Sequence, residues 1–380
     1  AGLGVIAGFY RPVGLVGDMG GGSLEVIEIL DDRVGETSVS LPLGALPVQA
    51  MLAGEGDRAK RRVDELLEAA LAPAMTRPVF HAVGGSWRAF AKAQMAAADA
   101  PVRVVHGYAI TTEAARAFAK KLWRLPVAKL AKLPGVPTRR APTLGAAALV
   151  MDRVLKRLAP EQVVFSALGV REGWLYAQLD RTERYLDPLI EGAQTVGVPM
   201  ARVARFGPAL ARWTESLFPG ETPTEQRLRV AACALSDIAW RDHADIQGVE
   251  TFHRLLRFPF IGLDHSERAF LALAVRARYP GRLDDPLLGP ALELLSPAAR
   301  RRAEILGRAM LLGYRISGSV PEILENARLK IEASGVRLEV DRTARVPDSE
   351  VVADRLRLLA SAVGVRGTEI VEAGADARGA

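Results

Sequence analysis

The sequence predicts an α/β protein in three parts: helices on a mixed sheet, then an all-helical domain, then a small α/β domain. Three observations predict this. Short apolar runs alternate with amphipathic segments up to about residue 180, strand signals vanish between 190 and 317, and short alternating segments return after 318. At 380 residues the chain exceeds the roughly 150 residues of one ordinary domain. We therefore expect domains over residues 1–185, 190–317 and 318–380.

The first part opens with a glycine-rich turn between two apolar strands, 15–18 and 24–30, which predicts a β-hairpin. Residues 37–41 supply a third strand. Apolar spacing then predicts helices over 58–71, 87–95, 111–122, 127–133 and 144–158, and strands over 79–83 and 163–166. The order β-β-β-α-β-α-α-α-β is that of helices packed against a mixed sheet.

The second part shows one helical pattern after another, following a linker expected over 181–197. The predicted helices are 200–217, 224–240, 249–256, 266–278 and 297–316. Ser296 is a plausible N-cap of the last helix and Gly318 a plausible stop. Beyond it, two alternating segments, 327–332 and 336–340, and a helix over 349–363 predict the small C-terminal domain.

Composition excludes several classes of protein. Hydrophobic residues make up 49% and charged residues 25%, the balance of a soluble globular chain rather than a disordered or fibrous one. No apolar stretch approaches the roughly 18 residues of a membrane helix, so we expect no membrane partner. Cys233, the single cysteine, excludes internal disulfides and cysteine-cluster metal sites, and fits a cytoplasmic location. We expect it to be a small core residue.

The net charge of +6 is mostly due to arginine and favours polyanionic partners. Specific nucleic-acid binding is disfavoured, because aromatic residues are only 6% and no zinc-finger, helix-turn-helix or RNA-recognition signature is present. The basic runs 58–62, 139–140 and 300–302 have two interpretations. They are solvated helix faces, or together they form a track for a long polyanion.

Residues 18–25 carry the strongest chemical signal. Three consecutive glycines, 20–22, lie between Asp18 and Glu25. Glycine leaves backbone N–H groups open to close approach by phosphate oxygens, and Ser23 adds a hydroxyl. Carboxylates beside a phosphate repel it unless a hard cation lies between them, so the combination indicates Mg²⁺. The alternative is a glycine-rich hairpin with solvated acids.

The segment 16–25 resembles the second phosphate-binding motif of the exopolyphosphatase and guanosine-pentaphosphate phosphohydrolase (Ppx/GppA) family. That family belongs to the actin, sugar-kinase and heat-shock ATPase superfamily. Five further segments fit the family in the same order: 41–45, 82–88, 106–108, 140–144 and 166–173. Together they cover residues 1 to about 180, and imply a ribonuclease H-like (actin-like ATPase) lobe.

The resemblance implies Mg²⁺-dependent hydrolysis of the terminal phosphoanhydride of inorganic polyphosphate, which releases orthophosphate. It implies catalytic and metal-binding roles for Asp18 and Glu25. The phosphate-binding residues that it implies are Gly20, Gly21, Gly22, Ser23, Gly84, Gly85, Ser166, Gly169 and Arg171. For Arg171, an ion pair with Glu172 is an equally good explanation.

The sequence also departs from the family pattern. Family members carry a first phosphate loop and a catalytic glutamate, both expected upstream of residue 1, so we expect this chain alone to be inactive. The helical domain resembles a degenerate histidine–aspartate (HD) metal-phosphohydrolase fold, with Ser236 in the place of the histidine before Asp237. Three histidines lie in the same region, His243, His253 and His265. We expect ordinary surface or packing roles for them and no tightly bound metal.

Two other functions remain open. Guanosine pentaphosphate (pppGpp) 5′-phosphohydrolase shares all of these motifs, and a non-catalytic regulator that binds alarmone or polyphosphate is compatible with the basic composition. An ATP-dependent kinase is least favoured, because no sugar-binding signature is present. The resemblance also implies a homodimer.

Overall fold

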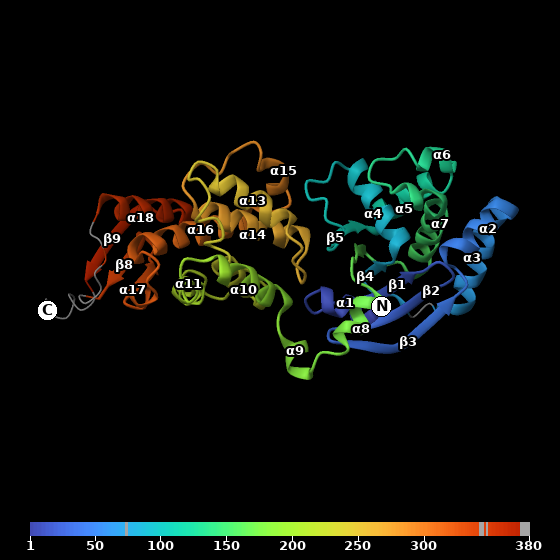
Figure 1. Ribbon diagram of the computed structural model, residues 1–380, viewed down its shortest axis with the longest axis horizontal. Helices are drawn as coiled ribbons and strands as arrows, with labels where there is room; N and C mark the ends of the chain where they lie inside the picture. The colour runs from blue at the N-terminus through green and yellow to red at the C-terminus, as the bar shows by residue number, and fades with distance from the viewer. Residues whose placement is uncertain (73–74, 342–345, 347–348, 373–380) are drawn as a thin grey trace. The chain divides into compact units, whose positions relative to one another are not determined.

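A six-stranded mixed sheet organises the first part of the chain (Figure 1). The computed structural model describes residues 1–72, 75–341, 346 and 349–372. The chain divides into one unit of residues 1–188 and 261–265, and another of residues 189–260 and 266–380. The α/β first unit and the mainly helical second unit, which ends in a small sheet, confirm the predicted fold class. The three domain boundaries stay predictions.

The strand order is β3-β2-β1-β4-β6-β5. The strands are β1 (Val13–Met19), β2 (Leu24–Leu30), β3 (Arg33–Leu41), β4 (Val79–Val83), β5 (Tyr108–Thr111) and β6 (Gln162–Phe165). The central strands β1, β4 and β6 are parallel to one another, whereas β2, β3 and β5 pair antiparallel with their neighbours.

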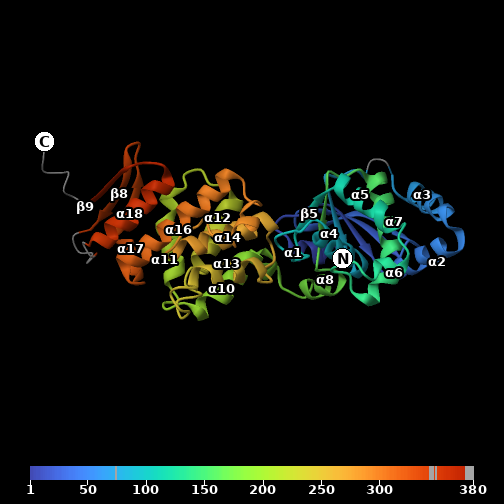
Figure 2. The ribbon, with the colours of Figure 1, turned by 90° about the horizontal axis from the view of Figure 1, so that it is seen from above.

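Helices cover both faces of this sheet. The helical elements of the unit are α1 (Gly2–Gly8), α2 (Ala45–Glu55), α3 (Asp57–Ala70), α4 (Gly85–Ala97), α5 (Thr112–Leu122), α6 (Val127–Leu130), η2 (Thr138–Arg140), α7 (Ala141–Leu158), α8 (Val170–Tyr176) and α9 (Arg181–Tyr185). Figure 2 shows α4, α5 and α7 grouped beside the strands. Trp87 of α4 is fully buried, and its Nε1 donates to the carbonyl of Ala147 in α7 at 3.0 Å, which fixes α4 in the larger core.

Alternate residues of β1 enter different cores, as the strand period requires. Leu15 and Met19 pack in the larger core with residues from α2 to α7. Val16 packs on the opposite face with Val5 and Ile6 of α1. Asp18, two residues after Val16, therefore lies on the face that α1 covers.

The second unit contains most of the remaining elements. These are α10 (Pro188–Met200), α11 (Phe206–Thr214), η3 (Glu215–Leu217), α12 (Pro223–Ala234), α13 (Gln247–Arg257), α14 (His265–Arg278), α15 (Gly289–Leu292), α16 (Pro297–Ser317), α17 (Pro321–Glu325), β7 (Ala327–Ile331), β8 (Gly335–Val340), α18 (Glu350–Val363) and β9 (Gly367–Glu372). Ser296 caps α16 and Gly318 ends it in the left-handed conformation, as predicted. Cys233 is fully buried, which confirms its core role.

Several expected elements differ in the structure. The segment expected as a linker, 181–197, contains the division between the two units at residues 188 and 189, but it is helical, since α9 and α10 occupy it. Asp180 accepts from the Glu183 amide at 2.8 Å and starts α9 with a capping box. The single helix expected over 200–217 is divided between α10, α11 and η3. Some elements of the structure were not predicted from the sequence, because they are short or lack a clear apolar period: α1, α2, α8, β5 and β9.

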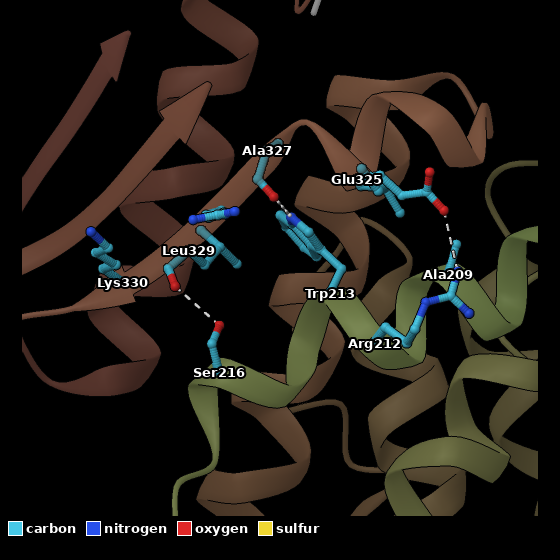
Figure 3. Close-up of a pocket in the computed structure, with 10 residues that line it drawn as sticks. Ala209, Arg212, Trp213, Ser216, Glu325, Ala327, Leu329 and Lys330 are labelled. Carbon is cyan, nitrogen blue, oxygen red and sulfur yellow. Dashed lines mark hydrogen bonds and ion pairs between the residues drawn. The ribbon is translucent and has the colours of Figure 1, made fainter. Parts of the chain in front are cut away.

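The edge strand of the small sheet is covered by side chains from the helical part. Trp213 Nε1 donates to the Ala327 carbonyl at 2.9 Å, and Ser216 Oγ donates to the Leu329 carbonyl at 3.0 Å (Figure 3). These bonds satisfy outward-facing carbonyls of β7 that would otherwise be open to another strand. The helical segment and the small sheet are thus tied together within the second unit.

Asp237, at the position expected for the HD pair, is held by two arginines. Its Oδ1 accepts from Arg202 at 2.9 Å and from Arg278 at 3.0 Å, and its Oδ2 accepts from Arg202 at 2.9 Å. The Ser236 hydroxyl bonds to the Cys233 carbonyl at 2.7 Å. Both carboxylate oxygens are therefore neutralised within the fold, although the HD resemblance itself stays a prediction.

Each of the three histidines of that region has a neighbour within its own unit. His243 lies beside Asp245, His253 packs edge-on against Phe252, and His265 Nε2 bonds to the Val104 carbonyl within the first unit. Among the described residues, no helix has the length and apolar character that crossing a membrane requires.

His81 of β4 is a buried histidine whose ionisation opposes folding. It is 4% exposed and packs against Phe9. Burial lowers the pKa of His81 to about 4, from an ordinary value of 6.5. Between these pH values the unfolded chain binds the proton and the folded chain does not, so acid favours unfolding.

We predict that His81 lowers the free energy of unfolding by about 3 kcal/mol as the pH falls from about 7 to 4. The His81→Gln variant should lose that part of the pH dependence, because glutamine does not titrate. Urea unfolding of both proteins across this range measures it. Parallel curves for the two proteins would contradict the assignment.

Candidate functional site

Three parallel strands end at the same edge of the large sheet, and each is followed by a segment that the sequence analysis singled out. Residues 20–23 follow β1, residues 84–85 follow β4, and residues 166–169 follow β6. In open α/β sheets, ligands bind in the crevice outside the carboxyl ends of the strands. The fold thus brings the three predicted segments to the edge where a ligand site is expected.

Asp18 and Glu25 are direct partners across β1 and β2, so both carboxylates lie on the face covered by α1. Burial raises the pKa of Asp18, and the charge of Glu25 raises it further, while the Arg88 guanidinium acts in the opposite direction. Ser23 Oγ donates to Glu25 Oε1 at 2.5 Å, which orients that carboxylate. The two carboxylates, Asp18 and Glu25, repel each other, and a bound cation would reduce this repulsion.

The glycine turn is held through its carbonyls. The amides of Ala45 and Leu46, at the start of α2, donate to the carbonyls of Gly20 and Gly21 at 3.0 and 2.9 Å. The amide of Gly20 itself closes the turn by donating to the Ser23 carbonyl at 3.0 Å. Within the described part of the chain, the amides of Gly21 and Gly22 have no such acceptor. Both of these N–H groups can therefore donate to an anion.

Nothing in the fold requires glycine in this turn. None of residues 20–22 has a left-handed φ, a Cβ on Gly22 would meet no atom within 4 Å, and one on Gly21 would meet only Leu46 Cδ1 at 3.8 Å. Gly84 is different, since its φ is +109° and a Cβ would lie 2.4 Å from the Met19 carbonyl oxygen. Close approach of a ligand to the backbone explains glycine at 21 and 22, whereas packing explains it at 84.

A cavity of about 150 Å³ lies beside Asp18. Its lining residues are Asp18, Val83, Gly84, Arg88, Ala167, Gly169, Val170, Arg171 and Glu172. The structure therefore gathers four of the predicted site residues around one cavity: Asp18, Gly84, Gly169 and Arg171. Their functional roles stay predictions.

Glu172 stabilises the start of α8, which borders this cavity. It accepts a hydrogen bond from the Gly169 amide at 2.8 Å, and this bond lowers the pKa of Glu172, as do the charges of Arg171 and Arg88. Among the described residues no Arg171–Glu172 ion pair forms within 4.0 Å, so the alternative explanation for Arg171 finds no support in the geometry.

Seven predicted residues do not line this cavity. Five of them belong to the β1–β2 hairpin described above: Gly20, Gly21, Gly22, Ser23 and Glu25. The other two are Ser166 and Gly85. Ser166 is fully buried, and its hydroxyl donates to the Leu168 carbonyl at 2.8 Å and accepts from the Leu168 amide at 3.1 Å. Ser166 thus holds the turn that leads to Gly169 and does not line the cavity. Gly85 lines a neighbouring cavity instead.

Arg88 and Glu172 also line the cavity, although the sequence did not predict them as site residues. Arg88 follows the 84–85 glycine pair by one helical turn, and its Nη1 donates to the Ala167 carbonyl at 2.8 Å. It lowers the pKa of both acids that line the cavity. A basic residue in the first turn of a helix after a glycine pair was the available signal.

The acid pair fits Mg²⁺. Mg²⁺ typically keeps several waters and is bound through one or two carboxylates together with substrate phosphates. Asp18 and Glu25 supply that number of carboxylates beside free amides suited to phosphate oxygens. In the described chain no three histidine, cysteine or acidic side chains converge as an all-protein metal cage, and Mg²⁺ needs none.

Comparisons with known proteins match both halves of the chain. The profile of the Ppx/GppA phosphatase family matches residues 2–182, and the profile "exopolyphosphatase, C-terminal" matches residues 189–370. Exopolyphosphatase 1 of Mycobacterium tuberculosis H37Rv is 32% identical over 174 residues, which are 43% of this chain and 50% of the relative. Retrograde regulation protein 2 of Saccharomyces cerevisiae is 27% identical over 197 residues, 48% of this chain and 32% of the relative.

The chain thus matches about half the length of the exopolyphosphatase relatives and a third of the yeast protein. Solved structures give matches of limited extent. An Aquifex aeolicus Ppx/GppA family member is 23% identical with a TM-score of 0.39, covering 47% of this chain and 60% of that one. An exopolyphosphatase from Cytophaga hutchinsonii is 17% identical with a TM-score of 0.40, covering 46% and 60%.

We predict that Asp18→Asn stabilises the free protein by up to about 1 kcal/mol at pH 7, because it removes a half-buried charge facing Glu25. Millimolar Mg²⁺ with orthophosphate should raise the melting temperature of the wild type but not of this variant. Asp31→Asn, at the exposed far end of the same hairpin, is the control. Equal Mg²⁺ effects in all three proteins would refute the site.

Proposed function

Because the chain belongs to the Ppx/GppA phosphatase family, we propose that it acts in the Mg²⁺-assisted hydrolysis of the terminal phosphoanhydride of inorganic polyphosphate. The observation that carries this proposal is the pair of free amides at Gly21 and Gly22, in a turn where the fold itself does not need glycine. Guanosine pentaphosphate carries the same terminal anhydride and is the competing substrate. The expected homodimer and cytoplasmic location stay predictions.

Phosphoryl transfer depends mainly on positioning and on stabilisation of charge. The amides of Gly21 and Gly22 donate to oxygens of the terminal phosphate. Their carbonyl-bonded turn keeps these donors in place, so little reorganisation is needed as negative charge develops.

The acids and the arginine have complementary tasks. Asp18 and Glu25 would hold Mg²⁺, which would neutralise charge on the phosphate oxygens. Ser23 keeps Glu25 oriented through its 2.5 Å hydrogen bond. Arg88 borders the cavity and supplies positive charge opposite Asp18. Orthophosphate leaves when these contacts are released.

The test is phosphate release from long-chain polyphosphate and from pppGpp by the protein expressed from its complete gene. We predict that Asp18→Asn and Glu25→Gln each lower kcat by roughly 100-fold or more, since each weakens stabilisation of the reacting phosphate. Asp31→Asn should retain full activity. Binding of polyphosphate without any phosphate release by the wild type would overturn the proposal in favour of a binding regulator.

A further inference from the structure

Another cavity of the first unit, of about 530 Å³, shares no lining residue with the cavity beside Asp18. Helix α2 contributes residues 49, 52 and 53, and α7 contributes residues 142, 145 and 146, each set with the i, i+3, i+4 spacing of one helix face. The rest of the wall comes from the end of α2 and from the segment that runs from α5 through α6. We call it the α2–α7 cavity, and its lining residues are Gln49, Leu52, Ala53, Gly56, Trp123, Leu125, Pro126, Val127, Leu130, Pro142, Gly145 and Ala146.

The wall of the α2–α7 cavity is mainly apolar. Apart from the Gln49 amide and the Trp123 indole nitrogen, the lining side chains are hydrocarbon or absent. The Trp123 indole N–H is buried and has no acceptor among the residues that the structure describes. A buried donor without an acceptor is unfavourable, because it has lost its hydrogen bond with water. An oxygen atom of a bound ligand would supply the acceptor that the fold does not.

Gly145, in the interior of α7, is a glycine that the packing of the fold does not require. A Cβ at this position would lie 3.7 Å from Leu130 Cδ1 and 3.8 Å from Trp123 Cα, which are ordinary van der Waals distances. Alanine is more favourable than glycine inside a helix, so helix stability alone would favour alanine here. Both Leu130 and Trp123 line the cavity, and a Cβ beside them would fill part of it. Glycine therefore keeps open a space that the free protein does not need.

The chain on the α6 side of this cavity is basic. Residues 114–151 contain lysines and arginines but no aspartate or glutamate. The Arg124 guanidinium carbon lies 5.1 Å from the centre of the Trp123 ring, so a cation adjoins the cavity wall. Arg124 and Lys129 are both exposed, and neither forms an ion pair within 4.0 Å in the described part of the chain. On the α2 side, Glu55 is exposed, so the α6 side is the end that favours an anion.

We infer that the α2–α7 cavity binds an apolar carboxylate of the fatty-acid class. The hydrocarbon chain of such a ligand lies along the apolar wall, where its removal from water is favourable. The carboxylate lies at the α6 side, where it accepts from the Trp123 indole N–H and pairs with Arg124. A phosphate ion would leave the hydrocarbon wall uncovered, and an alkane would leave the indole donor without an acceptor. The cavity volume falls within the roughly 300–1,000 Å³ typical of small-molecule sites.

The test uses decanoate as the ligand, below its micelle-forming concentration, with the protein expressed from its complete gene. Decanol keeps the hydrocarbon chain without the charge, and acetate keeps the carboxylate without the chain. Calorimetric titration measures the three affinities, and the indole N–H resonance of Trp123 is followed in protein labelled with ¹⁵N-tryptophan. We expect decanoate to bind roughly tenfold more tightly than decanol, and acetate to bind more weakly than either. The Trp123 indole proton should shift downfield with decanoate, because it gains an acceptor.

Two variants with matched controls locate the binding. Gly145→Ala fills the cavity, and Gly54→Ala, in α2, changes a helical glycine whose added Cβ would meet no atom within 4 Å and which does not line the cavity. Arg124→Ala removes the cation, and Arg300→Ala removes an exposed arginine from the second unit. None of the four changes should lower the melting temperature. We expect Gly145→Ala and Arg124→Ala each to weaken decanoate binding by roughly fivefold or more, with both controls within about twofold of the wild type. Arg124→Ala should leave decanol binding unchanged.

Three results would overturn the inference. Equal affinities for decanoate and decanol would remove the role of the carboxylate. Decanoate binding that survives both Gly145→Ala and Arg124→Ala would place the ligand outside this cavity. Binding to vesicles of anionic phospholipid that is lost in Arg124→Ala, without binding of free decanoate, would assign the basic segment to a membrane surface instead. None of these results depends on whether the protein hydrolyses a phosphoanhydride.

Discussion

The site depends on two peptide N–H groups that the fold leaves without an acceptor. In the turn after β1, the Gly20 amide is used to close the turn, and the carbonyls of Gly20 and Gly21 are held by the start of α2. The turn is therefore fixed while the amides of Gly21 and Gly22 stay open. A side chain at either position would find space in the free protein, so the constraint on these residues comes from what approaches them.

Two carboxylates next to this turn repel each other, which is unfavourable in the free protein. Asp18 and Glu25 are partners across two neighbouring strands. Burial raises the pKa of Asp18, and the charge of Glu25 raises it further. The Arg88 guanidinium, which lines the same cavity as Asp18, acts in the opposite direction and offsets part of this effect.

Sequence reasoning predicted the elements with a strong period and the site segments with unusual composition. The hairpin with its glycine turn, β4, β6 and α16 with both caps agree with the structure. It did not find β5, whose four residues follow no clear alternation, nor α2, which has no strong apolar face. Ser166 shows a second reason why sequence cannot predict the site fully. Its hydroxyl follows a strand, which suggested contact with a ligand, but it forms hydrogen bonds with the backbone of Leu168 in the same turn. Arg88 has a local signal, its place in the first turn of the helix after a glycine pair, but its contact with the Ala167 carbonyl depends on the tertiary packing of α4 near β6.

The most direct test of the central claim observes the two amides themselves. In protein labelled with ¹⁵N-glycine, the amide resonances of Gly21 and Gly22 are followed as orthophosphate is added in the presence of Mg²⁺. The account predicts saturable downfield shifts of both amide protons, with Gly20 shifting less because its proton is already bonded to Ser23. Unchanged Gly21 and Gly22 resonances at concentrations where phosphate binds elsewhere in the protein would contradict it.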